Sequence, residues 1–212
     1  VGEVDLSVSV KDGAIPPGMD QETISAALKV TPSNVSGASL KGAFNQLSSD
    51  VVGENGETEV IVEKVLNADQ SAAAQIFLDL SGAGASSSDK VKFSVNYDGA
   101  DLEATDFVAE ITIGNLDGGQ VADGVSVAFV QLSIDDLLGA LETDDVSATA
   151  FSEFVGDAGS DGRYEIETSV IIGGEEYSQT AGESGSIDLL EFIIDTEAPA
   201  AAELGVLSTD NG

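Results

Sequence analysis

Apolar and polar residues alternate along most of the chain, and this alternation predicts β-strands. In residues 4–10, Val4, Leu6, Val8 and Val10 fall on one face of an extended backbone, the pattern of a half-buried strand. Further segments with this pattern are residues 58–66, 75–80, 90–97, 107–113, 125–132, 146–154, 164–172 and 187–194. Gly, Asp and Asn separate them, and this spacing favours an all-β sandwich or barrel over alternating strands and helices.

Helix signals are confined to two short segments. Asp20 is a suitable N-cap for a helix over residues 21–29, in which Ile24, Ala27 and Leu28 share one helical face. Residues 134–141 form either a second short helix or a polar connection with one helical turn. Residues 82–89, GAGASSSD, are a low-complexity loop. The sequence therefore predicts an all-β fold with one or two short helices.

The distribution of charge suggests two units. Residues 1–92 contain 13 acidic and 6 basic residues, whereas residues 93–212 contain 26 acidic residues and one basic residue, Arg163. We expect an N-terminal β-rich domain of unspecified type over residues 1–103 and a β-sandwich over residues 104–199. The second unit has the length of one immunoglobulin-like domain. Residues 200–212 are then the start of a following repeat, or a tail. The inward-facing residues expected in the second unit are Val127, Phe129, Val146, Phe151, Tyr164, Ile166, Val170, Phe192 and Ile194.

The overall charge limits the partners of the chain. A net charge of −32 excludes direct binding to nucleic acid or to anionic membranes, because both require clustered Lys or Arg. No apolar stretch is long enough for a membrane-spanning helix, so we expect no membrane insertion. The acidic excess destabilises a compact chain unless cations screen or bind it. Two explanations stay open: the general acidity of a halophilic protein, or Ca²⁺ bound by carboxylate and carbonyl oxygens.

The residues needed for most enzyme chemistry are absent from the sequence. The chain has no His and no Cys, which removes the Ser-His-Asp triad and thiol catalysis. It has no Trp, the usual stacking platform for sugars, so a hydrolase with a paired carboxylate site is disfavoured. We therefore expect a protein that is not an enzyme.

A motif near the C-terminus carries the most specific signal. Residues 161–170, DGRYEIETSV, are followed by LLEFII at residues 189–194, which leads into DTEAP at residues 195–199. This order resembles the end of a bacterial immunoglobulin-like repeat from giant RTX-type adhesins, in which DG-x-Y opens the penultimate strand and D-T-x-A-P forms the junction. The resemblance covers about residues 155–212 and does not extend to residues 1–104. It implies an extracellular adhesin that binds Ca²⁺ at its repeat boundaries.

The residues of the junction support a calcium site without the family. Pro199 makes a stiff exit from the last strand. Asp195 and Glu197 flank that exit, and Asp210 lies in the next predicted turn. Carboxylates combined with backbone carbonyls are suitable Ca²⁺ ligands. The alternative is a solvated acidic hinge.

Two upstream turns are further candidates for calcium. Asp157 and Asp161 have the spacing of a calcium-binding turn, although an ordinary hairpin loop has the same composition. Asp98 and Asp101 flank a second such turn, with a weaker pattern.

These observations lead to one functional prediction and one alternative. We expect a non-enzymatic, calcium-stabilised segment of a bacterial cell-surface adhesin, either an extender or a ligand-binding module. Its partners would be neighbouring domains of the same long chain and a surface ligand, glycan or protein. The alternative is a subunit of an extracellular filament or surface layer, for example in a halophile, assembled by strand pairing. Residues 4–10 would then be the strand that enters a neighbour.

Overall fold

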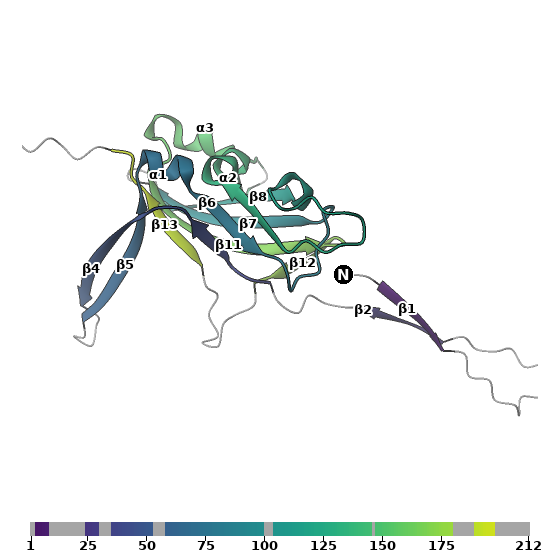
Figure 1. Ribbon diagram of the computed structural model, residues 1–212. Helices are drawn as coiled ribbons and strands as arrows, with labels where there is room; N and C mark the ends of the chain where they lie inside the picture. The colour runs from purple at the N-terminus through teal and green to yellow at the C-terminus, as the bar shows by residue number, and fades with distance from the viewer. Residues whose placement is uncertain are drawn as a thin grey trace, which may run out of the picture.

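The computed structural model describes residues 3–8, 24–29, 35–52, 58–99, 104–145, 147–179 and 189–197. This part of the chain consists mainly of β-strands with three short α-helices, which confirms the all-β prediction (Figure 1). Among the described residues, no helix is long and apolar enough to cross a membrane.

The larger sheet contains eight strands. They are β4 (Asn45–Val52), β5 (Thr58–Leu66), β7 (Lys90–Gly99), β8 (Thr105–Thr112), β10 (Glu142–Thr143), β11 (Gly162–Ile172), β12 (Glu175–Ser178) and β13 (Leu190–Ile194). Their order is β10-β8-β7-β11-β13-β5-β4, and β12 pairs with β11 outside this path. All neighbours are antiparallel except β13 and β5, which are parallel and paired only at Ile193↔Val65 and Ile194↔Leu66.

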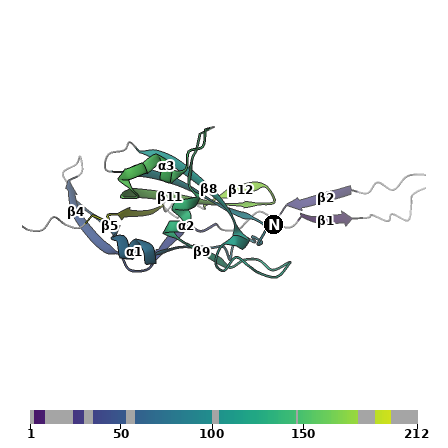
Figure 2. The same ribbon diagram turned by 90° about the horizontal axis from the view of Figure 1, so that it is seen from above.

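Two smaller sheets complete the strands. A three-stranded sheet has the order β3 (Ala38–Lys41), β6 (Gln75–Asp79), β9 (Phe129–Ser133). Strands β1 (Glu3–Val8) and β2 (Ile24–Lys29) form an antiparallel pair of their own. Figure 2 shows this pair at one end of the molecule and the β4–β5 hairpin at the other. The strand expected at residues 4–10 is therefore already paired over its described length.

The helices begin at capping residues. Helix α1 (Ala68–Ala73) follows a capping box in which Asn67 accepts a hydrogen bond from the Gln70 backbone and Gln70 accepts one from the Asn67 backbone. Helix α2 (Ile134–Ala140) follows Ser133, whose hydroxyl oxygen accepts a hydrogen bond from the Asp136 N–H. Of the two alternatives for residues 134–141, the structure therefore has the short helix.

Two other expectations about secondary structure were wrong. The described part of the helix expected at residues 21–29, Ile24–Lys29, forms strand β2, whose alternate apolar residues pair in register with those of β1. The strand expected at residues 146–154 is replaced by helix α3 (Phe151–Val155), and Val146 lies outside the described residues. Helix α3 instead buries Phe151 and Val155 on its inner side.

One hydrophobic core joins the two main sheets. It contains inward-facing residues of both β7 and β11 in the larger sheet and of β6 and β9 in the smaller one. Tyr97 and Tyr164 lie at its centre, with ring centroids 5.0 Å apart, and Phe151 packs 5.0 Å from Tyr97. Phe192 stacks on Tyr164 at 5.1 Å. The predicted inward residues found buried are Val127, Phe151, Tyr164, Ile166, Val170, Phe192 and Ile194.

Phe129 is the expected core residue that is not buried. Val130 and Leu132 of β9 face the core, so the alternation of the strand places Phe129 on the outer face, where it is 43% exposed. Its ring stacks on Phe77 of the neighbouring strand at 5.5 Å. The two rings form an apolar pair on the surface of the smaller sheet.

The boundary expected near residue 103 does not separate the sheets. Strand β7 precedes that boundary and β8 follows it, yet they pair along eight positions from Lys90↔Thr112 to Tyr97↔Thr105. Strand β5 likewise pairs with β13, and β6 with β9. Strands from both sides of residue 103 therefore share both sheets and one core.

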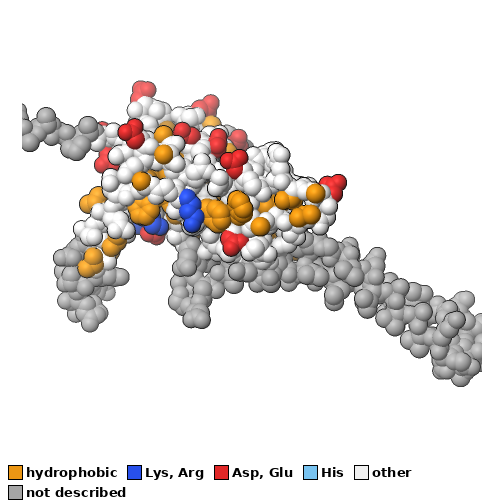
Figure 3. Space-filling view, viewed as in Figure 1, with side chains coloured by type: hydrophobic (Ala, Val, Ile, Leu, Met, Phe, Trp, Pro, Cys, Tyr) orange, Lys and Arg blue, Asp and Glu red, His pale blue; other side chains and the backbone are white. Residues whose placement is uncertain are grey.

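Acidic and apolar side chains are concentrated in different parts of the face drawn in Figure 3. Most of the visible acidic side chains lie over the helices. Apolar side chains gather below them and continue onto the base of the β4–β5 hairpin. The exposed large apolar residues are Leu47, Val60, Ile61, Val62, Val125, Phe129 and Leu189.

Candidate functional site

The two halves of the C-terminal motif lie side by side in the larger sheet. Strand β11, which contains the DGRY segment from Gly162 onward, pairs with β13 from Gly162↔Ile194 to Ile166↔Leu190 (Figure 1). Because the strands are antiparallel, the residue before β11 and the residue after β13 meet at the same end of the sheet. These residues are Asp161 and Asp195.

The exit from β13 is attached to the loop that precedes β11. The Thr196 hydroxyl donates a hydrogen bond to Asp161 Oδ1 at 2.7 Å, and the Thr196 N–H donates to Oδ2 at 3.1 Å. The Asp195 N–H donates to the Leu66 carbonyl at 2.9 Å, which extends the pairing with β5 by one residue. The Glu197 N–H donates to Asp195 Oδ1 at 3.2 Å. The first three residues after the strand therefore have a defined path.

Two buried tyrosines hold the loop from the inside. The Tyr97 hydroxyl donates to the Asp161 carbonyl at 2.8 Å, and the Tyr164 hydroxyl donates to the Ser160 carbonyl at 2.6 Å. Burial raises the pKa of both phenols, and the nearby Asp161 carboxylate raises them further. Both tyrosines therefore stay protonated and remain hydrogen-bond donors to the loop.

Gly162 allows the loop to lie close to the neighbouring strand. A Cβ atom at this position would be 2.6 Å from the Asp98 carbonyl oxygen and 2.7 Å from the Tyr97 ring. No side chain fits in that space, and this explains why glycine follows Asp161 in the motif.

The structure brings some of the predicted calcium ligands to one end of the sheet. Asp98 lies in β7 opposite Arg163 of β11, which is two positions after Asp161. Asp157 is exposed in the 3₁₀ turn η2 (Gly156–Ala158). Asp161, Asp195 and Glu197 form the hydrogen-bonded exit described above. Asp101 and Asp210 lie outside the described residues.

The described acids at this end of the sheet do not form a coordination shell for a metal ion. Among the residues that the structure describes, no three carboxylates lie close enough together to hold one metal ion. The Asp161 carboxylate already accepts hydrogen bonds from Thr196. On its own, the described geometry therefore makes a clamp on the chain exit.

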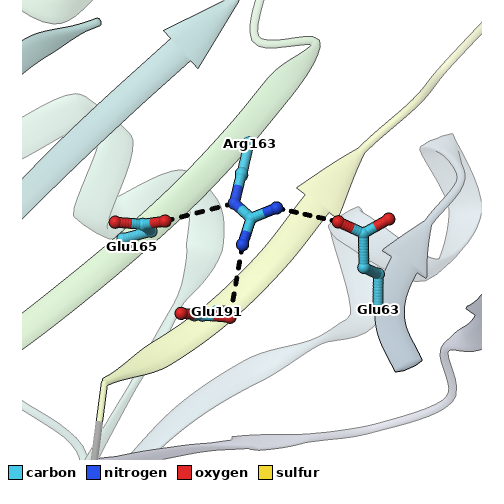
Figure 4. A network of polar contacts seen from close by, with 4 residues as sticks. All are labelled: Glu63, Arg163, Glu165 and Glu191. Atoms are coloured by element: carbon cyan, nitrogen blue, oxygen red, sulfur yellow. Dashed lines mark hydrogen bonds and ion pairs between the residues drawn. The ribbon is translucent and has the colours of Figure 1, made fainter. Parts of the chain in front are cut away.

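A charge network next to the clamp was not anticipated from the sequence. Arg163 contacts Glu63 of β5 at 2.8 Å, Glu165 of its own strand at 3.2 Å and Glu191 of β13 at 3.4 Å (Figure 4). Strands β5 and β13 pair at only two positions and separate before them. The contacts of Arg163 bridge the two strands where they are separated. Arg163 is the only basic residue after Lys92, and this isolation in an acidic sequence was the signal that could have pointed to its ion pairs.

A separate polar groove of about 510 Å³ lies between β8, β9 and α2. Three carboxylates line it, those of Glu110, Asp117 and Asp136, together with amide and hydroxyl side chains. Glu110 is paired with Lys90 at 2.8 Å, and Asp136 accepts a hydrogen bond from the Ser133 hydroxyl at 2.7 Å. The groove has no aromatic side chain in its described lining, so it offers no stacking surface for a sugar ring.

Asp89 is one of the residues that hold the segment expected as a low-complexity loop. Asp89 Oδ2 accepts hydrogen bonds from the Ser86 N–H at 2.8 Å and from its hydroxyl at 2.7 Å. Asp89 Oδ1 accepts one from the Gly173 N–H at 3.1 Å. Partial burial opposes ionisation of Asp89, but these hydrogen bonds outweigh it and lower its pKa. The loop is thereby connected to the β11–β12 turn.

Comparison of the chain with family models, with curated proteins and with solved structures finds no match.

Proposed function

We propose that the chain is a non-enzymatic, calcium-stabilised segment of a bacterial cell-surface adhesin. In this role it acts outside the cell as an extender or a ligand-binding module. Its direct partners are neighbouring domains of the same long chain, together with a glycan or protein ligand on another surface.

The observation that carries this proposal is the clamp between Thr196 and Asp161. A domain in a projecting rod has to pass to its neighbour in a fixed direction, because a loose connection would let the rod bend. Here the residues after β13 are bonded to the Asp161 loop and to Leu66. That loop is in turn held by buried Tyr97 and Tyr164. The exit is thus connected to the centre of the core.

The type of fold belongs to the same proposal. Two main sheets that share a core are compatible with a β-sandwich, and we propose an immunoglobulin-like relationship for the C-terminal half. The supporting feature is the pairing of β11 and β13, which contain the two halves of the motif, although β12 lies between them in the sequence.

Calcium is proposed for two reasons. The net charge of −32 creates a self-repulsion that a bound divalent cation would reduce. Asp98 near the end of β7, Asp161 before β11 and Asp195 after β13 lie at the same end of the sheet, where we propose that a following domain begins. Asp195, Glu197 and Asp161 would supply part of the ligand set, and Asp210 is the proposed further ligand.

Thermal melting of the metal-stripped chain tests the calcium proposal. We expect millimolar CaCl₂ in dilute buffer to raise the melting temperature, whereas molar KCl would be required if general screening were responsible. A ligand that binds only the folded state stabilises it by about 2.7 kcal/mol at a hundredfold excess over its dissociation constant. Stabilisation by KCl alone, with no effect of CaCl₂, would refute the calcium proposal and remove the main support for an adhesin.

Two substitutions distinguish a ligand from a structural contact. Asp195→Asn keeps the side-chain shape but removes a ligand charge, so it should reduce the calcium-induced shift and leave the metal-free melting temperature nearly unchanged. Thr196→Val removes a hydrogen bond to Asp161 but no carboxylate. It should lower the metal-free melting temperature and preserve the calcium-induced shift. The reverse pattern would show that Asp195 is not a ligand.

A further inference from the structure

The β4–β5 hairpin projects from the body of the molecule with apolar side chains exposed. It is the end of the larger sheet, and in the views of Figure 1 and Figure 2 it extends away from the other strands. Leu47 of β4 is 56% exposed and Val60 of β5 is 58% exposed. At the base of the same hairpin, Val65 and Leu66 are buried. The contact with the body therefore ends partway along β5.

Both faces of the projecting part are open. Successive residues of a strand point to opposite faces, and Val60, Ile61 and Val62 are consecutive exposed residues of β5. Neither face of the ribbon is therefore covered by the body at this position. A two-stranded ribbon has little stability of its own in water, which makes the hairpin a candidate for contact with another chain.

The outer edge of β4 lacks the features that usually prevent strand pairing. β4 is the last strand in the order of the larger sheet, so one of its edges has no neighbour among the described strands. Its sequence, NQLSSDVV, contains no Lys and no Pro, the residues that commonly protect such edges. Unpaired backbone N–H and C=O groups along this edge would accept an added strand.

We propose that β4 pairs with β4 of a second copy of the chain, antiparallel and across a two-fold axis. The two larger sheets would then join into one continuous sheet. An antiparallel strand edge is complementary to itself under two-fold rotation, so an identical copy supplies the matching donors and acceptors. This inference does not depend on the proposed role as an adhesin.

The low charge of β4 makes it a more favourable contact between two copies than a strongly acidic surface of the protein would be. The chain has 39 acidic residues, but β4 contains one charged residue, Asp50. Two such edges bring few like charges into contact.

The projection of the hairpin also keeps the acidic bodies apart. A strand of eight residues has a length of about 26 Å at 3.3 Å per residue. Charges separated by more than the Debye length, about 8 Å at physiological salt, are largely screened. The repulsion between two bodies of this charge is therefore small at physiological salt and grows as salt is removed. We expect a dimer whose affinity rises with ionic strength.

Sedimentation velocity of the full chain, over a range of protein and NaCl concentrations, tests the proposal. We expect a weak, reversible dimer, because pairing of one strand buries less surface than a standard interface. Leu47→Lys should raise the dissociation constant at least about tenfold, since the change occurs twice in a two-fold interface. The matched control is Val125→Lys, at a valine that is 52% exposed outside the hairpin. Both substitutions add a positive charge, which reduces the repulsion between two acidic copies and by itself favours the dimer. A loss of dimer in Leu47→Lys would therefore not be caused by its change in net charge.

Introduced cysteines test the direction of pairing. The chain has no native Cys, so each variant carries a single thiol. The substitutions Asn45→Cys, Leu47→Cys and Ser48→Cys place that thiol at three exposed positions of β4, and Ser152→Cys, at an exposed position of α3, is the control. Antiparallel pairing brings identical residues together only near the two-fold axis. One or two β4 positions should therefore form disulfide-linked dimers under mild oxidation, and Ser152→Cys should not.

Three results would overturn the proposal. The first is a monomer at every salt and protein concentration up to the millimolar range. The second is a dimer that Leu47→Lys and Val125→Lys weaken equally. The third is equal cross-linking at all three β4 positions, which would indicate parallel or non-specific contact.

Discussion

Thr196 donates two hydrogen bonds to the carboxylate of Asp161, a residue 35 positions earlier in the chain. The contact connects the chain just after β13, the last described strand, to the residue that precedes β11. It fixes the direction in which the chain leaves the larger sheet, and it can be measured as a coupling between the two side chains.

A double-mutant cycle should detect this coupling. Thr196→Val and Asp161→Ala should each lower the free energy of unfolding by about 1 kcal/mol, because each removes hydrogen bonds at the sheet end. The double variant should lose less than the sum of the two, since the side chains share one interaction. Urea unfolding of the four proteins gives these values. Strict additivity would mean that the contact does not form in solution.

Phe192 and Phe129 should respond very differently to truncation. Phe192→Ala should cost about 3–5 kcal/mol, because the ring is buried against Tyr164 and its removal leaves a cavity. Phe129→Ala should cost about 1 kcal/mol, because the ring is partly exposed and loses mainly its stacking on Phe77. Denaturant unfolding measures both. A similar cost for the two variants would contradict the assignment of Phe129 to the outer face.

Replacing Thr168 by valine should stabilise the protein. The Thr168 side chain is buried in β11, and its hydroxyl has no hydrogen-bond partner among the described residues. Thr168→Val keeps the branched shape and removes a desolvated polar group, so the free energy of unfolding should rise by about 1 kcal/mol. A lower midpoint in urea would show that the hydroxyl does have a partner in solution.

Asp89 should make stability depend on pH in the acid range. Partial burial works against its charged form, but the hydrogen bonds from Ser86 and Gly173 dominate and lower its pKa below the ordinary value of 3.8. A lowered pKa in the folded state means that the unfolded chain binds a proton first as pH falls. The contribution of Asp89 is therefore complete above the ordinary pKa and is lost as pH drops through the folded value.

This pH effect can be isolated with Asp89→Asn. The difference in unfolding free energy between the wild-type protein and Asp89→Asn should be largest at neutral pH and should shrink below pH about 4. Glu153→Gln, on exposed α3, controls for the loss of one negative charge from an acidic protein. A difference that stays constant with pH would show that the carboxylate does not act through its ionised form.

Strands with regular alternation were predictable from the sequence, and polar or very short ones were not. The segments expected at residues 58–66, 90–97 and 164–172 correspond to strands β5, β7 and β11. Strand β4 was missed because NQLSSDVV has no apolar alternation over its first half, and β3 and β12 have four residues each. Helix α1 did leave a signal, the Asn67 and Gln70 spacing of its capping box.

The site could be predicted only as separate pieces. The sequence pointed to Asp161, Asp195 and Glu197 as acids in turns, because turn residues are recognisable locally. Their proximity depends on the pairing of β11 with β13, a contact that no local pattern encodes. The Arg163 network depends in addition on β5, whose Glu63 lies 100 positions away in the chain.

The position of β13 determines the order in which the sheet can be completed. β13 is the last described strand in the sequence, but in the larger sheet it lies between β11 and β5. The β4–β5 hairpin joins the rest of that sheet only through β13. During synthesis the hairpin can form early from its local contacts, but it has no place in the sheet until residue 194 has left the ribosome. Such late, long-range pairing slows folding, and the growing chain therefore holds an open strand edge while residues 67–194 are synthesised.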